Sequence, residues 1–273
     1  MKVEMQMSAR FRLLDLSHQA VGKEVWIVGD IHGYYGLFSE LLRQIDYRPD
    51  THLVVSVGDL VDRGENSPAV VQWFRENGYA VRGNHEDMWI DLWAEHGLPY
   101  DESGELNPKW DSPTRTRTFW GNGQMETLCQ FRFAGIPAQA WLSYLASLPH
   151  AIVIGDYLIV HAGVNPDRSF EEQDIDTLTW VTHGFVDYPG EIPPTARMGK
   201  RLVVGHCETF LFGPIGEPVI RPDRVHIDLG TANGIGLAAF CLNDERVVIV
   251  DAPEREWQVP KIQVYLQKAR VPW

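Results

Sequence analysis

Residues 58–64 read GDLVDRG and directly follow the run LVVSV at residues 53–57. A short apolar run rich in β-branched residues is typical of a buried strand. The Gly-Asp that ends it would place the Asp59 carboxylate just outside the sheet, at the carboxyl end of the strand. The sequence therefore predicts a polar site at this edge of the sheet.

The same arrangement recurs four more times, after the apolar runs 25–28, 79–81, 157–160 and 202–204. In open α/β sheets, ligands bind outside the carboxyl ends of the strands, so we expect these ends to converge on one site. The polar side chains that they would deliver are Asp30, His32, Asp59, Asn84, His161 and His206.

Three of these motifs have a distinctive spacing. GDIHG at 29–33 is followed after 24 residues by GDLVDRG at 58–64, and after 18 more by GNHE at 83–86. This pattern resembles the calcineurin-like metallophosphoesterase superfamily, and DRG with GNHE is most similar to serine/threonine phosphoprotein phosphatases of bacterial and bacteriophage type. The later histidines extend the resemblance over roughly residues 25–232. It implies an α/β fold with two mixed β-sheets packed as a sandwich and flanked by helices, and a phosphoric ester hydrolase.

The resemblance also implies a dinuclear metal centre. It assigns one metal to Asp30, His32 and a bridging Asp59, and the other to Asp59, Asn84, His161 and His206. Two divalent ions would neutralise the phosphoryl oxygens and lower the pKa of a bridging water, giving a hydroxide nucleophile. Oxygen and imidazole ligands without a thiolate suit Mn, Fe, Co or Zn. We expect Mn²⁺, with Fe, Co, Ni or Zn as alternatives.

The remaining catalytic residues follow from the same resemblance. It assigns the general acid to His85, oriented by Asp62. A carboxylate beside an imidazole raises its pKa and fixes its tautomer, which favours proton donation. Arg63 and Arg82 would bind the phosphoryl group through their planar guanidinium forks. Glu86 either orients the ligands, which we favour, or is simply an acidic residue at the start of a helix.

The chain departs from the family pattern after the fourth predicted strand. A second phosphate-binding Arg usually follows the Trp there, whereas this chain has Trp180 followed by Thr182. Either Arg82 supplies the missing contact, or Arg197 or Arg201 approaches, or the substrate is less usual. The competing interpretation is that Arg82 only braces the turn before Asn84. A second departure is Asp228-Leu229-Gly230 in place of Asp-Thr-Gly, and we expect Asp228 either to support the metal ligands or to have a structural role.

The 273 residues predict a single domain in which 87–150 form a partly helical cap. Apolar spacing predicts helices at 34–47 and from Ser67, with Ser67 as the cap, and two more around 89–96 and 137–149. The chain then ends in segments of alternating apolarity, predicted to pair as an antiparallel second sheet: 225–229, 237–242, 247–250 and 261–266.

Composition limits the partners. A net charge of -13 disfavours nucleic acid, and no uncharged run is long enough to cross a bilayer. Three widely spaced cysteines fit a reducing cytoplasm, although Cys207, next to His206, could ligate a metal.

We therefore expect a phosphoprotein or a small phosphoester as substrate. The alternatives are hydrolysis of diadenosine tetraphosphate or related nucleotides, against which Asp62 and Glu86 argue, and a non-catalytic binding module.

Overall fold

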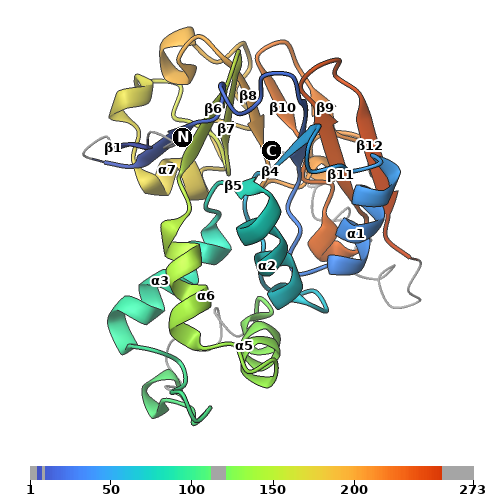
Figure 1. Cartoon of the computed structure of the whole chain (residues 1–273). Coiled ribbons are helices and arrows are strands. Elements are labelled where there is room, and N and C mark those ends of the chain that lie inside the picture. Colours follow the sequence, from blue (N-terminus) through green and yellow to red (C-terminus); the bar gives the residue numbers. More distant parts are fainter. Residues whose placement is uncertain (1–4, 8–9, 112–120, 254–273) are drawn as a thin grey trace.

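The computed structural model describes residues 5–7, 10–111 and 121–253, and consists of two β-sheets packed face to face with helices outside them (Figure 1). The five-stranded sheet has the order β12-β11-β3-β4-β5 and the seven-stranded sheet has the order β1-β2-β6-β7-β8-β10-β9. The predicted fold class is confirmed.

Three parallel strands extend from the centre of the five-stranded sheet to one of its edges. They are β3 (Glu24–Val28), β4 (His52–Ser56) and β5 (Tyr79–Ala80), while β11 (Gly236–Cys241) pairs antiparallel with both β3 and β12 (Val247–Asp251). The carboxyl ends of β3, β4 and β5 therefore lie along one edge, as the motif spacing requires.

The seven-stranded sheet supplies the other two strand ends. Its strands are β1 (Met5–Met7), β2 (Arg12–Asp15), β6 (Ala151–Ile154), β7 (Tyr157–Val160), β8 (Arg201–Val204), β9 (Val219–Ile220) and β10 (Arg224–His226). Strand β8 runs parallel to both β7 and β10.

This pairing corrects the prediction for the C-terminal strands. Strand β10 joins the seven-stranded sheet instead of pairing with β11 and β12, because alternating apolarity identifies a strand without identifying its neighbour. Residues 261–266 lie outside the described residues.

Alternation along β3 shows how the layers pack. Val25 and Ile27 enter the apolar layer shared by the two sheets, whereas Trp26 and Val28 face the helices on the outer side. A third apolar cluster, which includes Phe170 and Leu178, covers the outer face of the seven-stranded sheet. The order of layers is thus helix, sheet, sheet and mixed helix and loop.

The crossover helices are α1 (Tyr35–Gln44) and α2 (Ser67–Asn77). Ser67 is not the cap of α2: Asn66 is, and its side chain accepts a hydrogen bond from the Ala69 amide. The Ser67 hydroxyl instead lies within 3.2 Å of the Asp62 amide and of Thr127 Oγ1.

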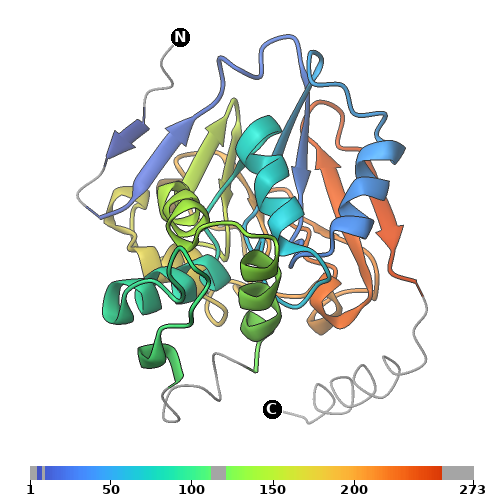
Figure 2. The same ribbon diagram turned by 60° about the horizontal axis from the view of Figure 1, so that its bottom comes forward.

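The described parts of residues 84–147, which are 84–111 and 121–147, contain a group of helices at one end of the molecule (Figures 1 and 2). They are α3 (Asn84–His96), η1 (Pro108–Asp111), α5 (Gln124–Phe133) and α6 (Ala138–Ser147). Helix α3 packs on α6, and α5 packs on α2. That this region caps the site remains a prediction.

Helix α5 was not predicted from the sequence. Its buried residues include Gln124 and Thr127 beside Leu128 and Phe131, so polar side chains interrupt the apolar stripe that identifies an amphipathic helix.

Shorter segments complete the described fold: η2 (Phe170–Glu172), α7 (Ile175–Trp180), η3 (Pro194–Arg197), η4 (Thr209–Leu211) and η5 (Thr231–Asn233). Among the described residues, no helix has the length and apolarity needed to span a bilayer.

Candidate metal centre and acid pair

The two sheets bring the predicted ligands together. Asp30 and Asp59 follow β3 and β4, and Asn84 begins α3 just after β5. His161 follows β7 and His206 follows β8, so both sheets contribute to one cluster.

Asp59 lies at the centre of this cluster. Its Oδ2 is 3.5 Å from His32 Nε2, and its Oδ1 is 3.5 Å from His161 Nε2. Ligand-type atoms of Asp30, Asp59 and His161 all lie within 4.8 Å of one another, and so do those of His32, Asp59 and His85. This central placement is what a bridging carboxylate requires.

Asn84 links the cluster to the seven-stranded sheet. Its Oδ1 is 2.8 Å from His161 Nε2 and 3.1 Å from His206 Nδ1. The rings of His161 and His206 lie edge to face with centroids 5.1 Å apart. The Asp30 carboxylate accepts a hydrogen bond from the His206 amide at 3.0 Å. Each of the six predicted ligands therefore contacts another member of the set.

Hydrogen bonds to the backbone orient two of the imidazoles. Nδ1 of His161 lies 2.8 Å from the Val57 carbonyl, and Nδ1 of His32 lies 3.2 Å from the Val61 carbonyl. A neutral ring that donates from Nδ1 carries its lone pair on Nε2, which is the arrangement found in metal-ligating histidines. In both residues Nε2 faces Asp59.

The donor set fits divalent cations. Asp30 Oδ1 is buried without a hydrogen-bond partner among the described residues. Burial raises the pKa of Asp30 and Asp59 well above the usual value, and burial lowers the pKa of His32 and His161 well below it. Several buried carboxylates at one point are unfavourable when charged unless a positive charge compensates them. Carboxylate, amide and imidazole donors without a thiolate suit Mn, Fe, Co or Zn.

The backbone around the cluster is strained. Positive φ angles occur at His32 (48°), Asp59 (50°), Asp62 (74°), Arg63 (71°) and His206 (64°). Such conformations are unfavourable for residues with a side chain and persist where the surroundings enforce them, commonly at functional sites.

Two glycines lie so close to the ligand carboxylates that a side chain would not fit at either position. A Cβ atom at Gly205 would overlap Asp30 Oδ1, and one at Gly83 would overlap Asp59 Oδ1. These positions need glycine because the ligand carboxylates approach the backbone closely.

Next to the cluster lies the predicted acid pair. His85 Nδ1 is 2.7 Å from Asp62 Oδ2, and the His85 amide donates to Asp59 Oδ1 at 3.0 Å. Asp62 is fully buried, and its Oδ1 accepts a hydrogen bond from Trp89 Nε1. The contact fixes Nδ1 as the side of the ring that faces Asp62, which leaves Nε2 on the side of Asp59, 3.9 Å from Oδ2.

The prediction that the pKa of His85 is raised is wrong for the chain without bound metal. Burial and the charge of Arg63 lower the pKa of His85 well below its usual value. Burial also raises the pKa of Asp62 to about 7 in spite of the hydrogen bonds that it accepts. Desolvation therefore outweighs the carboxylate's effect on the imidazole.

Glu86 joins the two motif loops. Its carboxylate accepts hydrogen bonds from the amides of Gly83 (2.8 Å), Asp59 (3.0 Å) and Leu60 (2.8 Å). It thereby orients the backbone on either side of Asp59.

The two candidate phosphate-binding arginines differ. Arg63 is exposed, and its Nη2 lies 3.3 Å from Asn122 Oδ1. Arg82 is buried, with Nε 2.7 Å from Asp87 Oδ1 and Nη2 2.5 Å from His150 Nε2. These contacts favour the bracing interpretation of Arg82, and its role at the phosphate remains a prediction.

Neither alternative arginine replaces the one missing at Thr182. Arg197 donates to the carbonyls of Ile192 and Lys200, and Arg201 contacts Glu245 and the Arg221 carbonyl. Arg201 also begins β8, at the opposite end of that strand from His206. Beside His206 the chain instead presents Trp180, a residue that is 44% exposed and whose ring centroid lies 6.3 Å from that of His206.

Two further predictions concern Cys207 and Asp228. Burial raises the pKa of the Cys207 thiol to about 12, which argues against a thiolate ligand. Asp228 Oδ1 accepts a hydrogen bond from the Gly230 amide, a backbone-supporting contact of the kind expected for it.

Sequence analysis missed three residues that contact Asp62: Trp89, Gln124 and Thr127. Trp89 lies within the helix predicted around 89–96, but that pattern does not indicate its contact with Asp62. Nothing in the sequence around Gln124 and Thr127 distinguishes them from polar residues on a helix surface.

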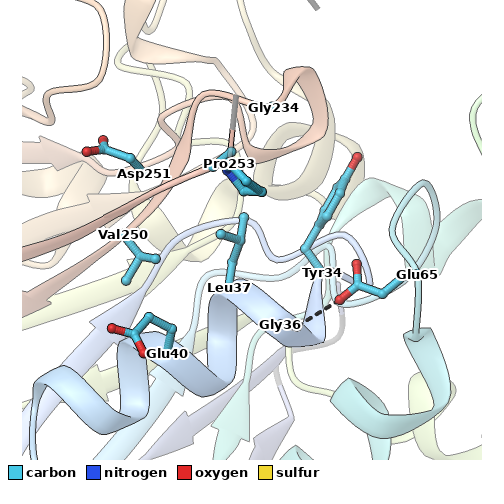
Figure 3. Close-up of a pocket in the computed structure, with 10 residues that line it drawn as sticks. Tyr34, Gly36, Leu37, Glu40, Glu65, Gly234, Val250, Asp251 and Pro253 are labelled. Atoms are coloured by element: carbon cyan, nitrogen blue, oxygen red, sulfur yellow. Dashed lines mark hydrogen bonds between the residues drawn. The ribbon is translucent and has the colours of Figure 1, made fainter. Parts of the chain in front are cut away.

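A separate cavity of about 360 Å³ lies between α1 and β12 (Figure 3). Tyr34, Leu37, Val250 and Pro253 help to line it, and the Gly36 amide there donates to Glu65 Oε1. None of its lining residues is a predicted site residue.

Known proteins resemble this chain over most of its length. Residues 23–214 match the model of the calcineurin-like phosphoesterase family. The chain is 27% identical to serine/threonine-protein phosphatase 2 of Salmonella typhimurium over 235 residues, 80% of this chain and 92% of that protein. It is 33% identical to a symmetrical bis(5'-nucleosyl)-tetraphosphatase of a Shewanella species over 271 residues, 82% of this chain and 96% of that protein.

A shorter match has a higher sequence identity. Over 73 residues the chain is 47% identical to serine/threonine-protein phosphatase 1 of Salmonella typhimurium, which covers 26% of this chain and 34% of that protein. A solved structure provisionally described as a diadenosine tetraphosphatase has a TM-score of 0.65 and 22% identity, covering 90% of this chain and 100% of the other. This last likeness concerns the fold. With the family model matching most of the chain around the metal-ligand cluster, the chain belongs to the calcineurin-like phosphoesterases and is a phosphatase of the phosphoric ester hydrolase class.

Proposed function

We propose that this protein hydrolyses phosphate monoesters, with phosphoserine and phosphothreonine in proteins as its substrates. The observation that carries this proposal is the 2.7 Å contact between His85 and Asp62, directly beside the ligands grouped around Asp59. An oriented imidazole next to a metal-ligand cluster is suited to protonating the leaving oxygen of an ester.

Six residues would hold the metals: Asp30, His32, Asp59, Asn84, His161 and His206. When bound, two divalent cations, with Mn²⁺ as our first choice, would neutralise phosphoryl oxygens and activate the attacking water.

The other residues act on the substrate directly. Arg63 would bind the phosphoryl oxygens, since its guanidinium is exposed beside the cluster and forked donors suit phosphate. As the bond from phosphorus to the leaving oxygen breaks, His85, which enters this step protonated on both ring nitrogens, gives that oxygen its Nε2 proton and keeps its Nδ1 proton directed at Asp62. Asp62 keeps Nδ1 in place and stabilises the ring through the transfer.

The alternative substrate class is a dinucleoside tetraphosphate. The 33% identity to a bis(5'-nucleosyl)-tetraphosphatase over most of both chains favours it, and Trp180 offers an exposed aromatic surface beside His206. The contact between Asp62 and His85 argues against it. An acid pair speeds the departure of an alkoxide, which needs a proton, more than that of a nucleotide phosphate, which needs little protonation.

A substrate panel with added Mn²⁺ distinguishes the two. It contains phosphoserine, phosphothreonine and phosphotyrosine peptides, diadenosine tetraphosphate and an aryl phosphate. We expect the highest kcat/KM on the phosphoserine and phosphothreonine peptides. Preference for diadenosine tetraphosphate would establish the alternative, and no hydrolysis of any ester would refute the proposal.

Metal removal gives a second test. Chelation should abolish hydrolysis of the aryl phosphate, and Mn²⁺ should restore it with two ions bound per chain. Full activity in protein shown to be free of metal would refute the dinuclear centre.

We also propose a cytoplasmic location. The support is that Cys129, Cys207 and Cys241 are free thiols, which fits a reducing compartment. Fractionation of the source cells would test this.

A further inference from the structure

Helix α5 binds the loop that carries Asp62 and Arg63. Three polar side chains spaced three residues apart along α5 face this loop. Gln124 Nε2 donates to Asp62 Oδ2 at 3.0 Å, the Asp62 amide donates to Thr127 Oγ1 at 3.0 Å, and Gln130 Nε2 donates to the Gly64 carbonyl at 2.8 Å. Residues separated by three positions share one face of a helix, so the whole face is committed to the loop.

The loop requires such support because its backbone is strained. Asp62 and Arg63 have φ angles of 74° and 71°. At the start of α5, a Cβ on Gly123 would overlap the Arg63 amide nitrogen. The helix thus rests directly on two consecutive residues in an unfavourable conformation, which persists only where neighbours hold it.

Gln124 has a special position on this face. Its side chain is fully buried, and its amide nitrogen reaches the same carboxylate oxygen that contacts His85 Nδ1. Its other polar atom, Oε1, has no hydrogen-bond partner among the described residues. An unpaired buried acceptor is destabilising, so packing alone would favour an apolar residue at this position.

The Asp62 carboxylate is therefore held from both sides. Trp89 Nε1 binds Oδ1 at 3.0 Å, and Gln124 Nε2 binds Oδ2 at 3.0 Å. With both oxygens held, the carboxylate cannot rotate, and the direction in which it accepts from His85 Nδ1 is fixed. The orientation of the His85 ring, and of Nε2 on its other side, follows from that direction.

We propose that Gln124 is a positioning residue for the acid pair, and that the inserted helix α5 thereby controls protonation of the leaving group. This inference rests on the proposed role of His85 in ester hydrolysis. It predicts a loss that depends on the leaving group, because an activated aryl ester needs little protonation while an alkyl ester such as phosphoserine needs much.

The test compares Gln124→Leu with the unaltered chain, both with Mn²⁺ bound, on a phosphoserine peptide and on an activated aryl phosphate. We expect kcat/KM for the peptide to fall by about tenfold or more and that for the aryl ester to fall by less than about threefold. Metal content and Tm are measured in parallel, and both should show metal-loaded, folded protein.

Gln130→Leu is the matched control. Gln130 lies on the same face and binds the same loop, but it contacts Gly64 and Ser67 instead of the Asp62 carboxylate. Any loss in this variant should be equal for the two esters. Should Gln124→Leu fail to fold, Trp89→Phe removes the donor on the other carboxylate oxygen and should give the same leaving-group-dependent loss.

Equal losses on the two esters in Gln124→Leu, or no loss, would overturn the role of Gln124. The same result in Trp89→Phe would show that holding the Asp62 carboxylate does not control protonation, and this would overturn the role as well. That outcome leaves the proposed function intact, since the proposed function fails only if the unaltered chain shows no Mn²⁺-dependent hydrolysis of either ester.

Discussion

His85 has two ring nitrogens with separate tasks. Nδ1 contacts Asp62 at 2.7 Å, and Nε2 lies on the side of the metal ligands. Replacing His85 with Asn removes the proton donor, so hydrolysis of an ester with a poor leaving group should slow by at least about a hundredfold, and that of an activated aryl ester far less. The rates on the two esters provide the measurement. A uniform loss with full metal occupancy would exclude His85 as the acid.

The two arginines of the motifs should respond differently to truncation. Arg63 is exposed and poised for the phosphoryl group, so Arg63→Ala should lower kcat/KM by about tenfold or more with unchanged metal content. The Tm should change little, because the side chain is not buried.

Arg82→Ala should instead act on stability. Arg82 and Asp87 form an ion pair in which each side chain is only 11% exposed. Removing one partner of such a pair leaves a buried charge, and the free energy of unfolding should fall by about 3 kcal/mol. Denaturant unfolding measures this. A stable Arg82→Ala protein with full metal occupancy and tenfold lower kcat/KM would support the phosphate-binding role instead.

How far these residues could be predicted depends on how they reach the site. Asp30, Asp59 and His161 lie within three residues of the end of a strand, so the end of an apolar run indicates their position. Gln124 reaches Asp62 across 62 residues of sequence from a helix with a polar buried face, and no local pattern encodes that approach. The head group of Arg82 was equally unpredictable, because its partner Asp87 and the neighbouring His150 are identified only by packing.

At the scale of elements, α2 offers a test of the corrected cap. Asn66 Oδ1 accepts from the Ala69 amide at 3.1 Å, so Asn66→Ala should lower the free energy of unfolding by about 1 kcal/mol. Ser67→Ala, by contrast, removes a hydroxyl that contacts Asp62 and Thr127 and should alter activity. A destabilised Ser67→Ala with an unaffected Asn66→Ala would return the cap to Ser67.

The segments that form strands were predicted more reliably than the pairing of those strands in the sheets. Residues in β3, β4 and β11 alternate between two apolar layers, a local signal that the sequence carries in full. Whether β10 joins β8 or β11 depends on packing between segments that are distant in sequence, and this is why the prediction for β10 was wrong. Helix α5 was missed for the related reason that its buried face is polar.

At the scale of the whole molecule, the metal centre joins the two sheets. Asp30 and Asp59 follow strands of one sheet, and His161 and His206 follow strands of the other. Ions bound between them would favour the folded chain over the unfolded chain, which has no assembled site. Metal binding should therefore raise the stability of the entire sandwich and not only that of the loops.

The pH dependence of this stability should weaken when metal binds. In the metal-free chain, burial raises the pKa of Asp62 and of Asp228 to about 7, against about 4 when unfolded. The folded chain then keeps protons that the unfolded chain has lost, so the free energy of unfolding should fall as the pH rises from about 6.5 to 8. Buried His150 and His226, whose pKa is lowered to about 3, oppose the fall near pH 6.5, because unfolded imidazoles are still about half protonated there. Above about pH 7.5 they are neutral in both states and no longer oppose it.

Saturating Mn²⁺ should oppose the fall, because the metal binds deprotonated ligands and its contribution grows with pH. Denaturant unfolding at pH 6.5 and pH 8, with chelator and with Mn²⁺, measures both slopes. Asp228→Asn, which removes one of the two carboxylates, should flatten the slope of the chelated protein. A chelated protein as stable at pH 8 as at pH 6.5 would show that these carboxylates are already charged without metal. The ions would then add charge compensation to a site that tolerates its buried negative charge alone.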